Sequence, residues 1–269
     1  MKRLISIAVT ILLSTFLIAS CDKQEKSQGF TATQLKQIEK VSSEYLIKHP
    51  DILIKASQAL QKQQMEKMQA KLTANALLNK AALVNDKATP ASHPVNAKVA
   101  VIEFYDLNCA YCHKIAPEIK ALMQANPDID FVFKAFPIFG SRWQSSQYGA
   151  EMGLALYHLG GFATFIAYHN AVFASGKMEG ELKVSDINTF AKQAADAHKV
   201  DFRKAEVLAK SFANRIDTNM ALGGQQMGFQ GTPAIIVMPL AGTRPTKVTV
   251  FPGYTSQAQL QQAIDKAKG

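Results

Sequence analysis

The chain has 269 residues and a formal net charge of +9 at pH 7, and its length is sufficient for one well-filled core plus an appendage. Its basic residues are scattered and form no run interleaved with aromatic side chains, which argues against nucleic-acid binding. The three cysteines include only one close pair, so a four-cysteine zinc site is excluded and no metal site is expected.

The N-terminus has the pattern of an export signal. A basic start and an apolar stretch over 4–18 precede small residues, so residues 1–20 are predicted to be a signal peptide that the mature protein lacks. The junction Ile-Ala-Ser-Cys, which ends at Cys21, resembles the lipobox of bacterial lipoproteins and implies lipidation of that cysteine. Cleavage without lipidation and an uncleaved membrane anchor are the alternatives.

Residues 21–85 are predicted to form an N-terminal helical arm. From residue 31 the segment is rich in Gln, Lys, Ala, Leu and Met, and its only proline, Pro50, splits it into two helices. Because two helices cannot bury their apolar stripes alone, we expect a homodimer or another homo-oligomer through this arm. Packing back onto the rest of the chain, or a role as a spacer, is the alternative. The stripes are Leu35, Ile38, Val41 and Tyr45 on the first helix, and Met65, Met68, Leu72 and Ala76 on the second.

The composition changes abruptly after the arm. Residues 86–97 have the Pro, Ser and Asp content of a linker, and a second domain is predicted over 98–269. Its start, 98–105, is a run of Val, Ile and Phe that is typical of a buried strand, and 130–136 is predicted to be another strand. The helical pattern over 109–125 lies between them and completes a βαβ unit.

The rest of the chain predicts helices and then strands again. Four helices are expected within a helical insertion at about 141–222. Strands are expected at 234–238 and 247–251, followed by a closing helix over 256–268. The predicted fold class is therefore α/β, with one sheet interrupted by the helical insertion.

Cys109 and Cys112 form a Cys-Ala-Tyr-Cys motif at the start of the predicted helix 109–125. Backbone N–H groups and the helix dipole stabilise a thiolate on the first sulfur, so Cys109 is predicted to be the attacking residue. Cys112 lies one turn later, where it can resolve a mixed disulfide formed by Cys109. The pair is itself the redox-active group, and neither a metal nor an organic cofactor is expected.

The same residues also fit the Cys-x-x-Cys-His motif of c-type haem attachment, with His113 as the histidine. A haem site needs neither a buried strand directly before the motif nor a βαβ unit around it, and this context disfavours haem. A purely structural disulfide is a further alternative. His113 is interpreted as a surface histidine that could supply a little positive charge near the thiolate.

Several separated motifs resemble the DsbA family of thiol:disulfide oxidoreductases, in its branch of DsbA-like envelope lipoproteins. These motifs are 101–105 (Val-Ile-Glu-Phe-Tyr) before Cys109, 133–137 (Phe-Lys-Ala-Phe-Pro) and 231–234 (Gly-Thr-Pro-Ala). The resemblance covers 98–269 and implies a thioredoxin-like fold with a helical insertion. It also implies a place in the bacterial cell envelope, facing the periplasm and tethered to a membrane.

The resemblance implies roles for further residues. Thr232-Pro233 is expected to be a cis bond packed against the cysteine pair, in a loop whose backbone pairs with substrate chains. Glu103 is expected to be a buried acid beneath the active site, with a raised pKa that allows proton relay. Lys134 is a possible relay or ion-pair partner of Glu103 on the neighbouring strand. The alternatives are a trans proline at 233, and a plain salt bridge or a solvated strand end for Glu103 and Lys134.

The dipeptide between the cysteines, Ala110-Tyr111, departs from the strongly oxidising members of the family because it contains no histidine. A less stabilised Cys109 thiolate predicts a less oxidising potential.

The predicted activity is the formation or rearrangement of disulfides in exported proteins that carry thiols or disulfides, with a membrane redox partner of unknown identity. A dedicated isomerase or reductase and a non-catalytic lipoprotein chaperone or scaffold are the alternatives.

Overall fold

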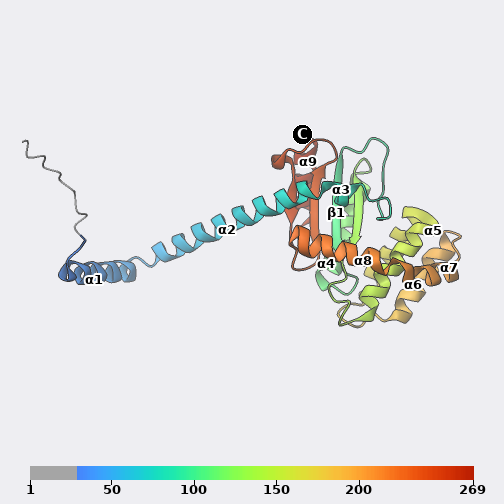
Figure 1. The fold of residues 1–269 in the computed structure, drawn as a ribbon, viewed down its shortest axis with the longest axis horizontal. Helices are drawn as coiled ribbons and strands as arrows, with labels where there is room; N and C mark the ends of the chain where they lie inside the picture. The colour runs from blue at the N-terminus through green and yellow to red at the C-terminus, as the bar shows by residue number, and fades with distance from the viewer. Residues whose placement is uncertain (1–28) are drawn as a thin grey trace, which may run out of the picture. The chain divides into compact units, whose positions relative to one another are not determined.

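The computed structural model describes residues 29–269 (Figure 1). The predicted signal peptide and Cys21 lie outside the described residues. The described residues divide into two units, of which the first ends at Leu60 and the second is Gln61–Gly269. Within residues 29–269, no helix combines the length and the apolarity that a membrane crossing requires.

The described part of the first unit is helical. Helix α1 (Ala32–Lys48) begins with a capping box, in which the Thr31 side chain accepts from Gln34 N at 3.3 Å and the Gln34 side chain accepts from Thr31 N at 2.9 Å. Helix α2 (Asp51–Leu78) begins directly after Pro50, so the predicted pair of helices separated by this proline is confirmed. No residue of α1 is buried.

The second unit is built on a four-stranded sheet in the order β2-β1-β3-β4. β1 (Val99–Tyr105) is parallel to β2 (Asp130–Ala135) and antiparallel to β3 (Ala234–Pro239), which is antiparallel to β4 (Thr249–Phe251). Helix α4 (Ala110–Ala125) connects β1 to β2 and completes the predicted βαβ unit. The predicted α/β class with a thioredoxin-like sheet and a helical insertion is confirmed.

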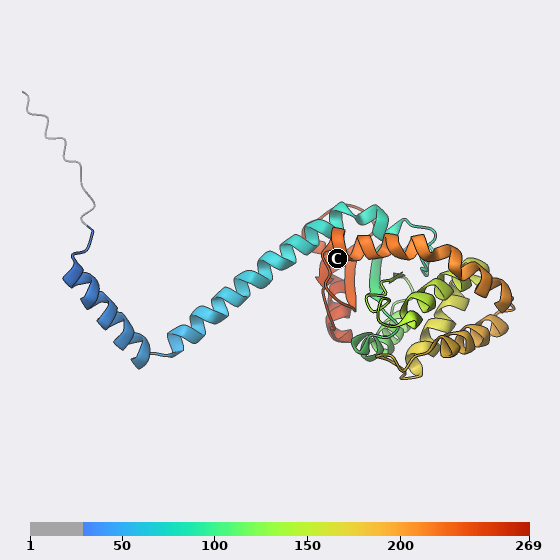
Figure 2. The same cartoon turned by 60° about the horizontal axis from the view of Figure 1, so that its bottom comes forward.

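Helices complete the second unit. Figures 1 and 2 show α5, α6 and α7 grouped at one side of the sheet, whereas α8 and η2 lead back across it. Helix α5 is kinked at Gly161, where φ is +71°. The insertion comprises α5 (Gln144–Ala174), α6 (Val184–Ala197), α7 (Phe202–Ala209), the short helix η1 (Lys210–Phe212), α8 (Ala213–Met220) and the π-helix η2 (Ala221–Met227). The remaining helices are α3 (Lys80–Val84), η3 (Pro245–Lys247) and α9 (Gln257–Lys268).

The two faces of the sheet carry separate cores. One core packs Val101, Tyr105 and Phe133 against α4, α5 and α9, and it contains both cysteines of the pair. The other packs Ile102 and Phe104 against the end of α2, α3 and η2. Alternate residues of β1 therefore face different cores, as the period of a strand requires.

Two segments differ from the sequence expectation. Leu72 and Ala76, which were assigned to the stripe of the arm, are buried in the second core, so the last turns of α2 belong to the catalytic unit. Residues 86–97, expected to be a linker, lie along β2, where Phe133 N donates to Pro90 O at 2.8 Å and Ser92 N donates to Phe131 O at 3.0 Å. These backbone bonds cover the outer edge of the sheet.

Candidate active site

Cys109 is the N-cap residue of α4, and Cys112 lies in its first turn. The turn before the helix is held by Asp106, whose carboxylate accepts from Asn108 N at 2.8 Å and from Phe139 N at 2.9 Å. Cys109 N also donates to Asp106 O at 3.1 Å. Both cysteines are buried free thiols, so the structure describes the reduced pair.

The surroundings of Cys109 favour its thiolate. The Cys112 thiol, the Thr232 side chain and the backbone N–H groups of Tyr111 and Cys112 together lower the pKa of Cys109 to about 6, against the opposing effect of burial. In the thiol form, Cys109 Sγ donates to Thr232 O at 3.1 Å. The buried Thr232 hydroxyl has no partner in this form, so it is free to donate to the thiolate.

The environment of Cys112 has the opposite effect. Burial, followed by the hydrogen bond to Cys109 and the charges of Cys109 and Glu103, raises the pKa of Cys112 well above its ordinary value. At neutral pH the pair therefore holds one thiolate, on Cys109, and one thiol, on Cys112. This asymmetry matches the predicted roles of attacking and resolving cysteine.

Glu103 lies on β1 and faces the same core as the cysteine pair. It is 2% exposed, and neither carboxyl oxygen has a hydrogen-bond partner. Burial, with a smaller effect of the Cys109 charge, raises the pKa of Glu103 to about 8. The side chain is therefore mostly neutral at pH 7 and holds a proton beneath the site.

The loop that leads into β3 completes the site. The Thr232-Pro233 bond is cis, as expected, and the Thr232 carbonyl lies against Cys109. Ala110 is half-buried, whereas the Tyr111 side chain is 60% exposed. Tyr111 is thus the most exposed residue of the Cys-Ala-Tyr-Cys motif.

The structure corrects the interpretation of His113 as a surface histidine. His113 is 9% exposed, with Nε2 at 2.8 Å from Leu107 O and Nδ1 at 3.2 Å from Phe173 O. Its ring also packs edge-on against Phe173 at 4.8 Å between centroids. Burial lowers the pKa of His113, although the two carbonyl groups and Asp106 oppose this effect.

The proposed pairing of Lys134 with Glu103 is wrong. Glu103 is paired in register with Phe133, so Lys134 lies one residue further along β2 and faces the other core. Its Nζ donates to Thr89 Oγ1 at 2.7 Å and lies 3.4 Å from Asp86 Oδ2. Lys134 does form an ion pair, but its partner comes from the segment 86–97.

Sequence reasoning missed two groups at the site. Asn108 donates to Ser145 Oγ at 3.0 Å and to Ser146 Oγ at 2.9 Å, which ties the cysteine turn to α5. An Asp-x-Asn sequence before a helix is typical of a turn and could have indicated this role. His169 is fully buried beside Tyr105, with no partner on either ring nitrogen, and burial lowers its pKa to about 3. No sequence signal distinguishes it from the apolar face of α5.

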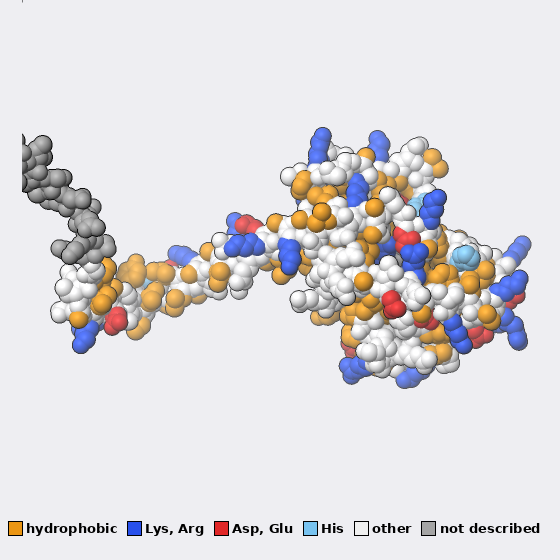
Figure 3. Space-filling model, in the orientation of Figure 1, with side chains coloured by type: hydrophobic (Ala, Val, Ile, Leu, Met, Phe, Trp, Pro, Cys, Tyr) orange, Lys and Arg blue, Asp and Glu red, His pale blue; other side chains and the backbone are white. Residues whose placement is uncertain are grey.

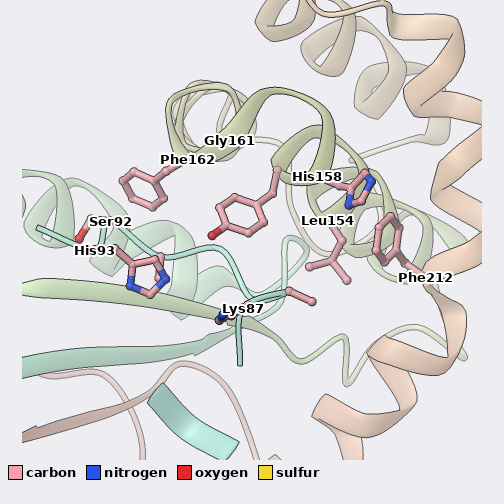
Figure 4. Close-up of a pocket in the computed structure, with 11 residues that line it drawn as sticks. Lys87, Ser92, His93, Leu154, His158, Gly161, Phe162 and Phe212 are labelled. Carbon is pink, nitrogen blue, oxygen red and sulfur yellow. The ribbon is translucent and has the colours of Figure 1, made fainter. Parts of the chain in front are cut away.

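A separate hollow of about 490 Å³ lies between the segment 86–97 and α5 (Figure 4). Figure 4 shows His93 and His158 on opposite sides of it, with Phe162 and Phe212 among the other lining residues. None of its lining residues is a cysteine. Among residues 29–269, no group of three or more His, Cys, Asp or Glu side chains is arranged to hold a metal ion.

Comparisons with known proteins point to two families. The thioredoxin-like domain family matches residues 85–268, and the family described as the N-terminal domain of the copper resistance protein ScsC matches residues 34–67. None of the curated proteins matches the chain significantly.

Several solved structures are similar. BcfH of Salmonella enterica Typhimurium is 38% identical with a TM-score of 0.76, and the match covers 88% of this chain and 97% of BcfH. A thioredoxin-like oxidoreductase of Silicibacter pomeroyi DSS-3 is 28% identical with a TM-score of 0.58, over 71% of this chain and 98% of that one. Proteus mirabilis ScsC in a transitional conformation is 23% identical with a TM-score of 0.56, over 90% and 99%, and supports the fold alone.

Proposed function

This chain belongs to the thioredoxin-like family, in its DsbA-like part, and is an oxidoreductase; on that premise we propose that it forms and rearranges disulfide bonds in exported proteins through Cys109 and Cys112. The observation that carries the proposal is the opposite shift of the two thiol pKa values at the start of α4. A structural pair of cysteines has no need of this asymmetry.

The first step is attack by the Cys109 thiolate on one sulfur of a substrate disulfide. A Cys109–substrate disulfide forms, the substrate disulfide breaks, and its other sulfur leaves as a thiolate. That substrate thiolate can then attack a different disulfide of the same substrate and free another thiolate. When a substrate thiolate finally attacks the mixed disulfide and releases Cys109 as a thiolate, the substrate disulfides are rearranged with no net transfer of electrons.

In the second step Cys112 attacks Cys109 Sγ. The Cys109–Cys112 disulfide forms, the substrate's remaining sulfur leaves as a thiolate, and two electrons have passed to the substrate. The same two steps in the reverse direction oxidise a substrate dithiol to a disulfide and reduce the Cys109–Cys112 disulfide to two thiols. A membrane redox partner then has to remove those two electrons by thiol–disulfide exchange.

Glu103 supports the second step. Cys112 must lose its proton before it can attack, yet burial raises its pKa well above the ordinary value. Glu103 titrates near neutral pH in the same core, so its carboxylate form can take this proton and release it later. Its charge influences the pKa of Cys112, as that of Cys109 influences its own.

Trapping of substrate proteins tests the roles of the two cysteines. We expect Cys112→Ser to accumulate mixed disulfides in a non-reducing gel, because Cys109 still attacks but nothing resolves the product. Cys109→Ser should trap none and should lose insulin reduction. Equal trapping by the two variants would overturn the assignment.

The proposal includes export to the cell envelope and lipid attachment at Cys21. It rests on the sequence pattern before this cysteine and on the need for an oxidising compartment. Metabolic labelling with a fatty acid should mark the wild-type protein and not Cys21→Ser. Equal labelling of both would exclude lipidation at this position.

We further propose that copies of this chain assemble through α1. Leu35, Ile38, Val41 and Tyr45 are all exposed, and hydrophobic side chains gather along this helix in Figure 3. Burial against a second copy, in a homodimer or larger homo-oligomer, removes this apolar surface from water.

Light scattering on the protein without its signal peptide and lipid should therefore give the mass of an oligomer. Ile38→Asp should dissociate it, whereas Ser43→Asp introduces the same charge on the opposite face of α1 and should not. A wild-type monomer would contradict the assembly.

A further inference from the structure

A groove of about 680 Å³ lies between the last turns of α2 and the loop that precedes the cis peptide bond. Lys67, Met68 and Lys71 line it from α2, and Met227 and Gly231 line it from the loop side. All of these residues belong to the second unit. The groove shares no lining residue with the hollow of Figure 4.

The α2 wall of the groove is fixed to the sheet. The side-chain amide of Gln69, oriented by its partners, donates to Val250 O at 3.0 Å and accepts from Val250 N at 3.1 Å on β4. One to two turns later, Asn75 Nδ2 donates to Met227 O at 3.1 Å, and Leu72 is buried in the second core. The groove is therefore held open by structure that is independent of any ligand.

The groove begins next to the reacting sulfur. Gly231 lines it and is followed directly by Thr232, whose carbonyl oxygen lies 3.1 Å from Cys109 Sγ. Adjacent Cα atoms are about 3.8 Å apart, and an extended chain advances about 3.3 Å per residue. A polypeptide bonded to Cys109 can thus reach the groove within a few residues of its own cysteine.

The charge of the groove is uncompensated. Lys67 and Lys71 lie four residues apart on α2, both are exposed, and neither forms an ion pair within the described residues. No acidic side chain lines the groove. Two neighbouring cations without a partner attract an acidic group from a bound chain.

The floor and walls between these cations are apolar. Met68 contributes an exposed, flexible thioether side chain, which adapts to apolar partners of different shape, and Pro252 adds further apolar surface. An acidic residue alone would leave this surface uncovered. Two lysines next to an apolar surface therefore favour binding of a segment that carries both an acidic and an apolar side chain.

We propose that this groove is a substrate subsite, which binds an unfolded polypeptide segment with an acidic residue beside an apolar one close to its reactive cysteine. This inference rests on the proposed disulfide exchange and specifies its substrate class. The end of α2 is then a specificity element, with Lys67 and Lys71 as its charge-selecting residues.

The test compares reduction of two disulfide-linked fluorogenic peptides that differ only in Glu-Leu or Lys-Leu near the cysteine. The wild-type protein should prefer the Glu-Leu peptide by roughly tenfold in kcat/KM, and the preference should weaken as salt is added. Lys67→Glu/Lys71→Glu should reverse it.

The matched control is Lys36→Glu/Lys40→Glu on α1. It has the same charge change and the same four-residue spacing, and it should keep the wild-type preference. No wild-type preference, or an equal shift in both double variants, would overturn the subsite. Failure of the wild-type protein to reduce either peptide or oxidised glutathione would instead overturn the proposed function, and the subsite with it.

Discussion

Two buried ionisable side chains lie one residue apart on neighbouring strands and face opposite sides of the sheet. Lys134 on β2 is 1% exposed and is surrounded by Thr89 Oγ1 and Asp86, which in turn lies 3.2 Å from Arg215 Nη1. Glu103 on β1 is 2% exposed and has no partner for either oxygen. The two side chains are almost equally buried, but only Lys134 has a partner of opposite charge.

The difference separates a compensated charged group from a carboxyl group that keeps its proton at neutral pH. Although burial alone would raise it, the charge of Lys134 and the hydrogen bond from Thr89 hold the pKa of Asp86 below its ordinary value, so Asp86 is ionised at pH 7. Burial lowers the pKa of Lys134, and the charge and hydrogen bond of Asp86 oppose this effect. Without such partners, burial raises the pKa of Glu103 to about 8, within the range where exchange operates. An unpaired buried charge lowers the stability of the folded state. Unpaired ionisable groups of this kind occur at functional sites, where a group that binds and releases a proton near neutral pH is useful.

The largest expected effect is on the pH dependence of stability. Between the unfolded pKa of 4.5 and the folded pKa of about 8, the folded state binds the Glu103 proton more tightly, so the free energy of unfolding falls as pH rises through this window. Glu103→Gln removes this loss. At pH 8.5, denaturant unfolding in the presence of reductant should show the variant to be more stable by about 3–5 kcal/mol.

At pH 4 the two proteins should differ little, because Glu103 is then neutral in the folded state and largely protonated in the unfolded one. Parallel pH profiles for the wild type and Glu103→Gln would show that this carboxyl group has no raised pKa, and the contrast with Lys134 would disappear.

Lys134→Met should have the next largest effect, and of the opposite sign. It keeps much of the side-chain volume but leaves Asp86 with Arg215 alone, so unfolding should cost about 2–3 kcal/mol less. The initial rate of insulin reduction should change less than about twofold at a temperature where the variant is folded. A large loss of rate in the folded variant would mean that Lys134 also acts at the active site.

Comparison of these residues shows what the sequence can predict. Helices, strands and the cysteine motif follow from local signals, such as the apolar run 99–105 and Cys-x-x-Cys at a helix start. The face of each side chain depends on strand register, and a shift of one residue reverses it. Nothing in the sequence sets Glu103 opposite Phe133, so the sequence is compatible with a Glu103–Lys134 pair that the strand register contradicts.

The segment 86–97 shows a second limit. Its Pro and Ser content is typical of a linker, yet Ala91 forms a bridge to Val132 and Asp86 neutralises Lys134. Composition describes the segment alone, whereas the partner strand and the buried lysine that fix it lie about 40 residues later in the chain. The Lys67–Lys71 groove was missed for the same reason, because its other wall comes from the loop before β3.

Exchange kinetics give a smaller effect for Glu103→Gln. Loss of the proton acceptor should slow resolution by Cys112 roughly tenfold at pH 7, seen as slower decay of a mixed disulfide in stopped-flow measurements. The attack step should still follow the Cys109 thiolate and fall as pH drops through about 6. A variant with normal resolution at pH 7 would limit Glu103 to a structural role.

Substitution of His113 should have the smallest effect. It tests whether a buried ionisable group that has hydrogen-bond partners stays neutral at pH 7. His113 lies on the Glu103 side of the sheet, but its two ring nitrogens face the carbonyl groups of Leu107 and Phe173. A neutral imidazole can donate to only one of them, and the lowered pKa keeps the ring neutral at pH 7. His113→Gln retains a donor, whereas His113→Phe retains only the packing against Phe173, so the Phe variant should be less stable by about 1 kcal/mol. Exchange rates at pH 7 should change less than about threefold in both variants, since a neutral ring lends no charge to the Cys109 thiolate. A tenfold loss in both variants, together with a higher apparent pKa in the pH–rate profile of Cys109, would show that His113 is protonated and stabilises the thiolate.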